Sequence, residues 1–113
     1  MTLATLVALS LVSGSPLPPR SSLDRGWALA PIHRALPALK ACHARARKPG
    51  GVCRGRITVR FAIDPSGGVT VEDLQDTTGC PGLVTCVGEV FSRMVYAPPP
   101  RELTRIVYPL RFD

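Results

Sequence analysis

Four cysteines and two histidines are the residues of this 113-residue chain whose types could support chemistry. A cysteine nucleophile needs a thiolate beside a base. Cys42 and His43 are neighbours on an expected helix and point in different directions, so they make a poor catalytic pair. Disulfides are the usual state of an even number of cysteines in a small exported chain. The pattern favours structural cysteines over the alternative, a small secreted thiol or redox enzyme that uses a reactive cysteine.

The same residues are poorly spaced for a metal site. Zinc sites use pairs such as C-x2-C or H-x3-H, whereas 10, 26 and 5 residues separate the successive cysteines, and nine separate His33 from His43. The glycine pairs at 50–51 and 67–68 suit turns rather than a phosphate-binding loop. None of the eight acidic residues belongs to a pair placed for acid–base work. We therefore expect no catalytic residue, no metal and no cofactor, and predict that the chain is not an enzyme.

The N-terminal sequence predicts export. Residues 3–12 form an uncharged apolar run, and small residues suit cleavage after Gly14, although no Lys or Arg lies near the first residue. This pattern predicts a signal peptide over 1–14. The run is shorter than the roughly 20 apolar residues that cross a bilayer, so no transmembrane span is expected. The Pro- and Ser-rich residues 15–26 predict a linker, and 27–113 a folded domain in the periplasm or outside the cell.

The segment 56–63 is the one around which the domain is expected to form. Its side chains alternate between polar and apolar, which predicts a strand with one buried face. Residues 64–68 carry Pro and Gly in a turn, and 69–76 resume the strand pattern, so the two strands form a hairpin. The acidic step at 72–73 suggests a bulge or the end of the regular strand pattern.

Residues 27–47 and the stretch around 83–94 predict two helices. In the first, apolar side chains at spacings of four, three and three form one stripe, namely Ile32, Leu36, Leu39 and Cys42. Pro37 falls inside this pattern, and its ring clashes with the carbonyl four residues earlier. We therefore expect the first helix to kink or restart at Pro37.

Residues 104–112 predict a third strand, which must lie at an edge because Pro109 cannot donate a ladder hydrogen bond. The second helix returns the chain along the sheet, so this strand runs antiparallel to the first. An all-antiparallel sheet then has the order 2-1-3. The predicted fold is an α+β two-layer sandwich, with a three-stranded antiparallel sheet and two helices on one face.

Four cysteines allow three pairings, which the sequence alone leaves open. The expected topology favours one of them. Cys53 precedes the first strand and Cys80 follows the second, at the open ends of one hairpin. Cys42 and Cys86 lie on two helices that face the same sheet. We therefore predict the disulfides Cys53–Cys80 and Cys42–Cys86.

The net charge of +6 and the pI near 9.8 predict attraction to anionic partners. Arg56 and Arg60 project from the solvent face of the first strand, beside Arg105 or Arg111 of the third. This basic face lacks the aromatic side chains on which single-stranded nucleic acids stack, so nucleic acid is not expected. A solvated polar face is the simpler interpretation, and contact with an anionic envelope polymer or an acidic protein is the sharper hypothesis.

The order of elements and four sequence motifs resemble the C-terminal domain of TonB-type energy transducers, and more closely the AgmX/PglI-type C-terminal domains of myxobacterial envelope proteins. The matching motifs, spread between Pro31 and Phe112, are LKACHAR, GRITVRFAIDPSGGV, PGLVTCVGEVFSRMVYAPP and VYPLRF. Cysteines recur on the two helices of that family, which supports Cys42 with Cys86. His43 stands where the family commonly has Tyr, and Cys53 and Cys80 look like an addition.

This resemblance implies a non-enzymatic periplasmic module that pairs an exposed strand with a segment of an envelope protein. The partner-binding residues would be those of the edge strand, Arg105, Val107, Pro109 and Arg111. AgmX-type relatives are linked to gliding motility. The chain departs from both families in its lack of a membrane anchor and a long linker, so the expected role is a free-standing adaptor. A disulfide-stapled structural domain without a dedicated partner is a further alternative.

Overall fold

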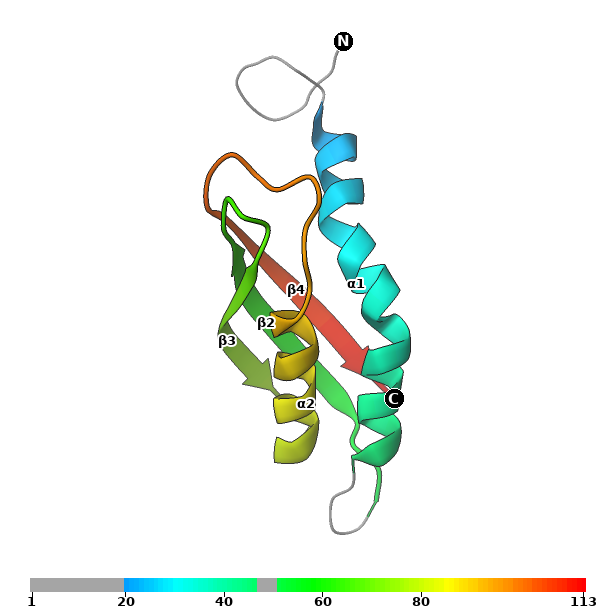
Figure 1. Cartoon of the computed structure of the whole chain (residues 1–113). Coiled ribbons are helices and arrows are strands. Elements are labelled where there is room, and N and C mark those ends of the chain that lie inside the picture. The colour runs from blue at the N-terminus through cyan, green and yellow to red at the C-terminus, as the bar shows by residue number, and fades with distance from the viewer. Residues whose placement is uncertain (1–19, 47–50) are drawn as a thin grey trace. The chain divides into compact units, whose positions relative to one another are not determined.

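The computed structural model of the chain describes residues 20–46 and 51–113, and the predicted signal peptide lies outside these ranges. The elements are helix α1 (Arg20–Arg45), strands β2 (Gly55–Ile63) and β3 (Val69–Asp76), helix α2 (Pro81–Ser92) and strand β4 (Thr104–Phe112) (Figure 1). The chain divides into two compact units, residues 1–30 and 31–113. The second unit contains the sheet, α2 and most of α1.

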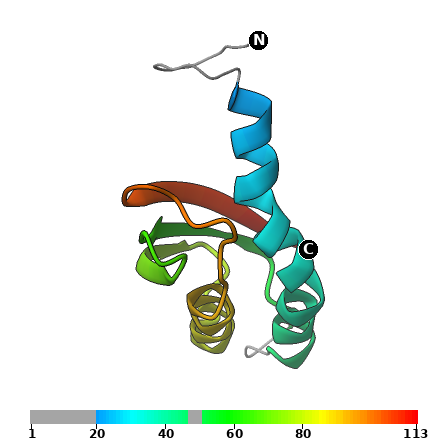
Figure 2. The same ribbon diagram turned by 45° about the horizontal axis from the view of Figure 1, so that its top comes forward.

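The sheet is antiparallel throughout and has the order β3-β2-β4, so the first strand in sequence is central and the predicted order 2-1-3 is confirmed. Within residues 31–113, α2 and the C-terminal part of α1 lie on the same face of the sheet (Figure 2). Among the described residues of 31–113, no layer covers the opposite face, which we call the open face. The predicted α+β two-layer fold is therefore confirmed.

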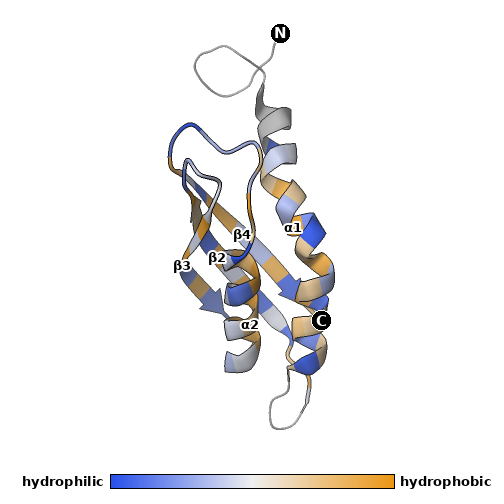
Figure 3. Ribbon diagram, in the orientation of Figure 1, coloured by the Kyte–Doolittle hydropathy of each residue, from blue (hydrophilic) through white to orange (hydrophobic). Residues whose placement is uncertain are grey.

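β2 supplies the centre of the core because every second side chain points toward the helices. Ile57, Val59, Phe61 and Ile63 are fully buried. The ring of Phe61 lies 5.4 Å from that of Phe91 on α2. Figure 3 shows the resulting alternation of hydrophobic and hydrophilic residues along the strands.

α1 differs from the prediction at its start and at Pro37. The helix begins at Arg20, so residues 20–26 of the predicted linker are helical. The helix also continues through Pro31 and Pro37, so the restart expected at Pro37 does not occur. The cluster of prolines in the linker ends at residue 19, which leaves 20–30 free of proline. A proline inside a helix removes one hydrogen bond, and here the bonds on either side of Pro37 maintain the helix.

Leu36 does not belong to the buried stripe of α1. Ile32, Leu39 and Cys42 are buried, whereas Leu36 is 37% exposed. An α-helix turns about 100° per residue, so Leu36 lies about 40° to one side of Ile32, while Leu39 and Cys42 lie about 20° and 80° to the other. The stripe therefore follows the side on which Cys42 lies, where α1 is joined to α2.

The β2–β3 hairpin has the predicted turn and the predicted bulge. Arg60 pairs with Asp73 and Phe61 with Val71, so Glu72 is the extra residue of the bulge. In the turn, the Asp64 carboxylate accepts hydrogen bonds from the hydroxyl and the amide of Ser66 and from the amide of Gly68. These bonds, led by the Ser66 hydroxyl, lower the pKa of Asp64. The side chain thus closes the turn that sets the register of the hairpin.

The same turn packs against the segment that follows α2. The amide of Tyr96 donates to the carbonyl of Gly67 over 2.9 Å. Gly67 has φ of 91°, and a Cβ at this position would overlap the Tyr96 carbonyl oxygen. Tyr96 is 1% exposed, and burial raises its pKa to about 12 against the opposing effect of Arg34. This contact holds the β2–β3 hairpin to the chain that leads into β4.

Candidate partner-binding edge

β4 is a regular edge strand. Its nine residues pair with β2 without a register shift, from Thr104 opposite Ile63 to Phe112 opposite Gly55. In the part of the chain that the structure describes, β4 has no second neighbour. Four residues of this strand were predicted to bind a partner, and the structure shows all of them exposed: Arg105, Val107, Pro109 and Arg111. Val107 is 52% exposed.

The position of Pro109 indicates which backbone groups of β4 face outward. Pro109 lies opposite Thr58 and has no N–H, so β4 loses no hydrogen bond to β2 if the Pro109 nitrogen points away from β2. Backbone groups alternate in direction along a strand, so residues two positions apart share a direction. We infer that Arg105, Val107 and Arg111 offer their N–H and C=O groups to the solvent.

The structure brings some of the predicted basic residues together and separates others. Arg56 lies directly opposite Arg111, as the sequence suggested, and both are exposed. Arg60 instead lies opposite Val107 on one side and Asp73 on the other, without an ion pair in the described residues. The positive charge on the open face therefore concentrates at the end where β2 begins and β4 ends.

Arg105 is neutralised by an interaction that sequence reasoning missed. Its Nε lies 3.2 Å from Glu72 Oε1, although Arg105 is on β4 and Glu72 is on β3. The central strand between them carries Ala62, which is opposite Arg105 and only 4% exposed. The bulge at Glu72 and the small side chain of Ala62 permit this ion pair across β2. Neither the bulge position nor the strand pairing alone would have revealed it.

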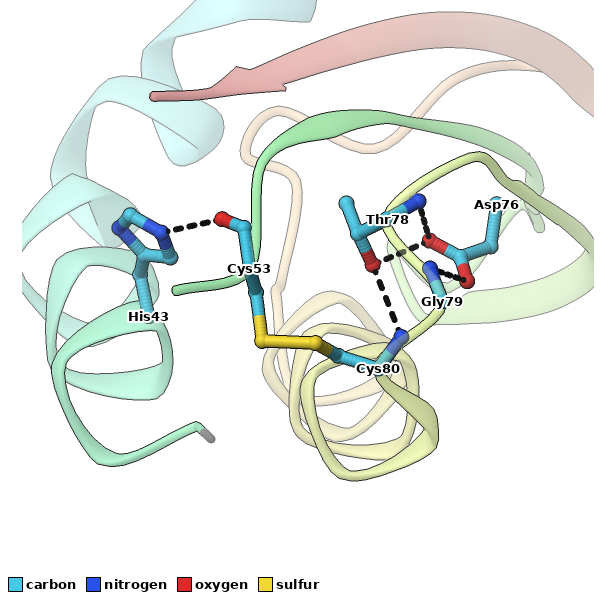
Figure 4. Close-up of a disulfide and its surroundings, with 6 residues drawn as sticks. All are labelled: His43, Cys53, Asp76, Thr78, Gly79 and Cys80. Carbon is cyan, nitrogen blue, oxygen red and sulfur yellow. Dashed lines mark hydrogen bonds between the residues drawn. A yellow bond between two sulfur atoms is a disulfide. The ribbon is translucent and has the colours of Figure 1, made fainter. Parts of the chain in front are cut away.

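Both predicted disulfides are present, Cys42–Cys86 and Cys53–Cys80, and they use all four cysteines. The first joins α1 to α2, and the second joins the chain before β2 to Cys80, the residue immediately before α2 (Figure 4). Such bonds persist in oxidising compartments, so they are compatible with a periplasmic or secreted protein. With every sulfur paired, no thiolate is available to act as a nucleophile in this state.

Polar side chains hold the Cys53–Cys80 disulfide in place (Figure 4). The Asp76 carboxylate accepts hydrogen bonds from the amide and hydroxyl of Thr78 and from the amide of Gly79, at 2.6–3.0 Å. The Thr78 hydroxyl in turn accepts from the amide of Cys80. On the other side, His43 Nε2 lies 2.7 Å from the Cys53 carbonyl oxygen. His43 itself is half-buried, with its ring 5.1 Å from that of Phe112.

The comparisons with known proteins provide no relative. A scan against family models, a search of curated proteins and a search of solved structures each gave no significant match. Within residues 20–46 and 51–113, no helix has the length and apolar character to cross a membrane. The same ranges contain no group of three or more His, Cys, Asp or Glu residues arranged to hold a metal ion. The function must therefore be argued from the edge strand and the charges around it.

Proposed function

We propose that this domain is a non-enzymatic interaction module of the cell envelope, periplasmic or secreted, that binds an envelope protein by accepting an extended segment beside β4. The observation that carries the proposal is the unpartnered, regular edge of β4. Added strands gain affinity from backbone hydrogen bonds and selectivity from alternate side chains. Arg105, Val107 and Arg111 offer outward backbone groups, and the exposed side chains of Val107 and Arg111 project beside them. The resemblance to TonB-type and AgmX/PglI-type domains implies the same mode of binding.

The reactive-cysteine alternative has less support. A thiol enzyme needs a free thiolate as its nucleophile, and all four cysteines are joined in pairs. Titration of the unreduced protein with a thiol reagent should detect no free thiol. Two or more reactive thiols would favour the enzyme over the binding module.

The variant Val107→Pro tests strand addition. The substitution removes an outward N–H and should lower affinity about tenfold or more, because one net hydrogen bond contributes about 0.5–1.5 kcal/mol and the ring also hinders the approaching strand. A photo-crosslinker at position 107 would first capture the partner in native envelopes, and mass spectrometry would identify the segment bound. Calorimetry with that segment as a synthetic peptide then compares the variants.

Val107→Thr is the matched control, because it keeps the N–H and a β-branched side chain. Its affinity should stay within about twofold of the wild type, since backbone groups supply most of the binding energy. Both variants should retain the urea midpoint of the parent. Equal affinity for Val107→Pro and wild type would exclude binding along β4.

A further inference from the structure

A hollow of about 390 Å³ lies where β2 begins and β4 ends. Three arginines line it, together with a hydroxyl, a ring and one carboxylate, and the full lining is Arg54, Gly55, Arg56, Thr77, Arg111, Phe112 and Asp113. We call this feature the arginine hollow. Arg54 and Arg56 are exposed, and the side chain of Arg111 is 73% exposed. Their guanidinium groups are thus accessible to a ligand.

The positive charge of the arginine hollow is poorly compensated. Arg56 and Arg111 are directly opposite on neighbouring strands, a placement that is destabilising for like charges. In the described residues, the sole carboxylate within ion-pair distance of these arginines is Asp113, 4.0 Å from Arg111 Nε and 89% exposed. Such an exposed ion pair adds little stabilisation, so it leaves most of the positive charge uncompensated. At the other end of β4, Arg105 is already paired with Glu72 at 3.2 Å.

The backbone beneath the arginines is held firmly. The amide of Arg56 donates to Thr77 Oγ1 over 2.8 Å, and the amide of Thr77 donates to the Arg56 carbonyl over 2.9 Å. Gly55 has φ of 140°, and a Cβ there would lie 2.6 Å from Thr77 Oγ1. The close approach of these two segments sets the position from which Arg54 and Arg56 project.

We propose that the arginine hollow receives a carboxylate of the segment that pairs with β4, so that the partner segment carries acidic residues at the end beside Arg111. This inference rests on the proposed function. Arg111 both lines the hollow and belongs to the outward-facing residues of β4, so a docked strand would pass directly beside it. Guanidinium groups bind carboxylates through paired, charge-assisted hydrogen bonds. The acidic residues of the partner segment are expected beside Arg111 and not at the opposite end of β4, because Arg105 at that end is already paired with Glu72.

A second copy of the chain fits this site poorly. Symmetric antiparallel pairing of two β4 strands about Tyr108 would place Arg105 of one copy opposite Arg111 of the other. Like charges directly opposite are unfavourable in a sheet. An acidic polypeptide satisfies both the open backbone groups and the charge, whereas an anionic polysaccharide satisfies only the charge.

Binding of three designed peptides tests the inference. Each is a nine-residue alternation of Thr and Val. The first peptide has glutamate at its first and third residues, the second has glutamate at its seventh and ninth residues, and the third has glutamine at all four of these positions. Fluorescence polarisation should show that glutamates at one end alone raise affinity about tenfold over glutamines. The gain should shrink with added salt. It should vanish in the double variant Arg56→Gln, Arg111→Gln and persist in Arg101→Gln, the matched control outside the strand.

Two results would overturn the inference while strand addition stands: an equal gain from glutamates at both ends, or a gain that survives in the double variant. Polygalacturonate, a carboxylate polymer without amide groups, should not bind in a saturable way that depends on Arg56 and Arg111. Tight, arginine-dependent binding of that polymer would mean that the ligand of the arginine hollow is a polysaccharide and not an acidic peptide.

A small dicarboxylate separates failure of this inference from failure of the proposed function. Glutarate should cause saturable NMR shifts at Arg54, Arg56 and Arg111, and none at these positions in the double variant. If glutarate binds but no peptide does, strand addition fails and the carboxylate site remains. If glutarate leaves these signals unchanged, the hollow is not a carboxylate site.

Discussion

The two edges of the sheet differ in how they are protected. β3 is bulged at Glu72, carries exposed acidic residues, and is packed so closely by α2 that a Cβ on Gly88 would lie 3.1 Å from Leu74. β4 pairs in unbroken register and is longer by one residue. Bulges and charges are the usual devices that prevent an edge from accepting another strand. β3 has both, whereas β4 carries Pro109 and two arginines but no bulge, so its ladder stays unbroken and the two edges are suited to different roles.

The two edge strands also differ in whether a disulfide fixes the chain next to them. The disulfide Cys53–Cys80 connects the chain before β2 to the chain after β3. β4 has no covalent link of its own and arrives through the long connection 93–103. The protected edge is thus also the fastened one, which leaves β4 free to adjust to a partner.

The largest effect on stability is expected when the disulfide next to β3, Cys53–Cys80, is removed. Replacing Cys53 and Cys80 by Ala should lower the free energy of unfolding by about 2–4 kcal/mol, because the unfolded chain regains the freedom that the disulfide removed. Urea unfolding would measure the change. Hydrogen exchange should show β3 amides losing more protection than β4 amides.

The pair Cys42→Ala, Cys86→Ala is the control for that experiment. It removes the other disulfide and should lower global stability without a preferential loss in β3. Equal exchange in β3 and β4 after loss of Cys53–Cys80 would show that this disulfide does not act on one edge.

A smaller effect is expected at the turn that joins β2 to β3. Gly67→Ala should destabilise the fold by roughly 1–3 kcal/mol, because the φ of Gly67 is unfavourable for alanine and the new Cβ meets the Tyr96 carbonyl. Thermal unfolding would measure it. Gly82→Ala, in α2 with no atom within 4 Å of the added Cβ, should be neutral or stabilising. A neutral Gly67→Ala would mean that the turn is not held against Tyr96.

The smallest effect concerns the direct link between the two edges, Glu72 with Arg105. A double-mutant cycle with Glu72→Gln and Arg105→Gln should give a coupling of about 0.2–1 kcal/mol, because both side chains are partly exposed to solvent. The coupling should fall as salt is added. Zero coupling at low salt would indicate that the two edges are electrostatically independent.

Much of the architecture was predictable from local patterns. The alternation over 56–63 predicted a strand buried on one face, and Pro109 predicted an edge strand because it lacks a donor. The acidic step at 72–73 suggested either a bulge or the end of the regular pattern, and a bulge is present. The expected topology predicted both disulfides. The prediction was wrong for the start of α1, for the break at Pro37 and for Leu36. These depend on whether neighbouring hydrogen bonds and packing outweigh a local preference, which a pattern of residue types does not specify.

The sequence by itself determined the period of each element and the chemical character of its faces, because side-chain direction in a strand or helix follows from residue number. Tertiary structure alone decided which charges meet. Register places Arg56 opposite Arg111, and the bulge allows Glu72 to reach Arg105 over Ala62. The arginine hollow combines residues from three separate segments of the chain, 54–56, 77 and 111–113. Such proximity depends on the register between distant strands, which is why the sequence left both Arg105 and Arg111 as possible neighbours of Arg56.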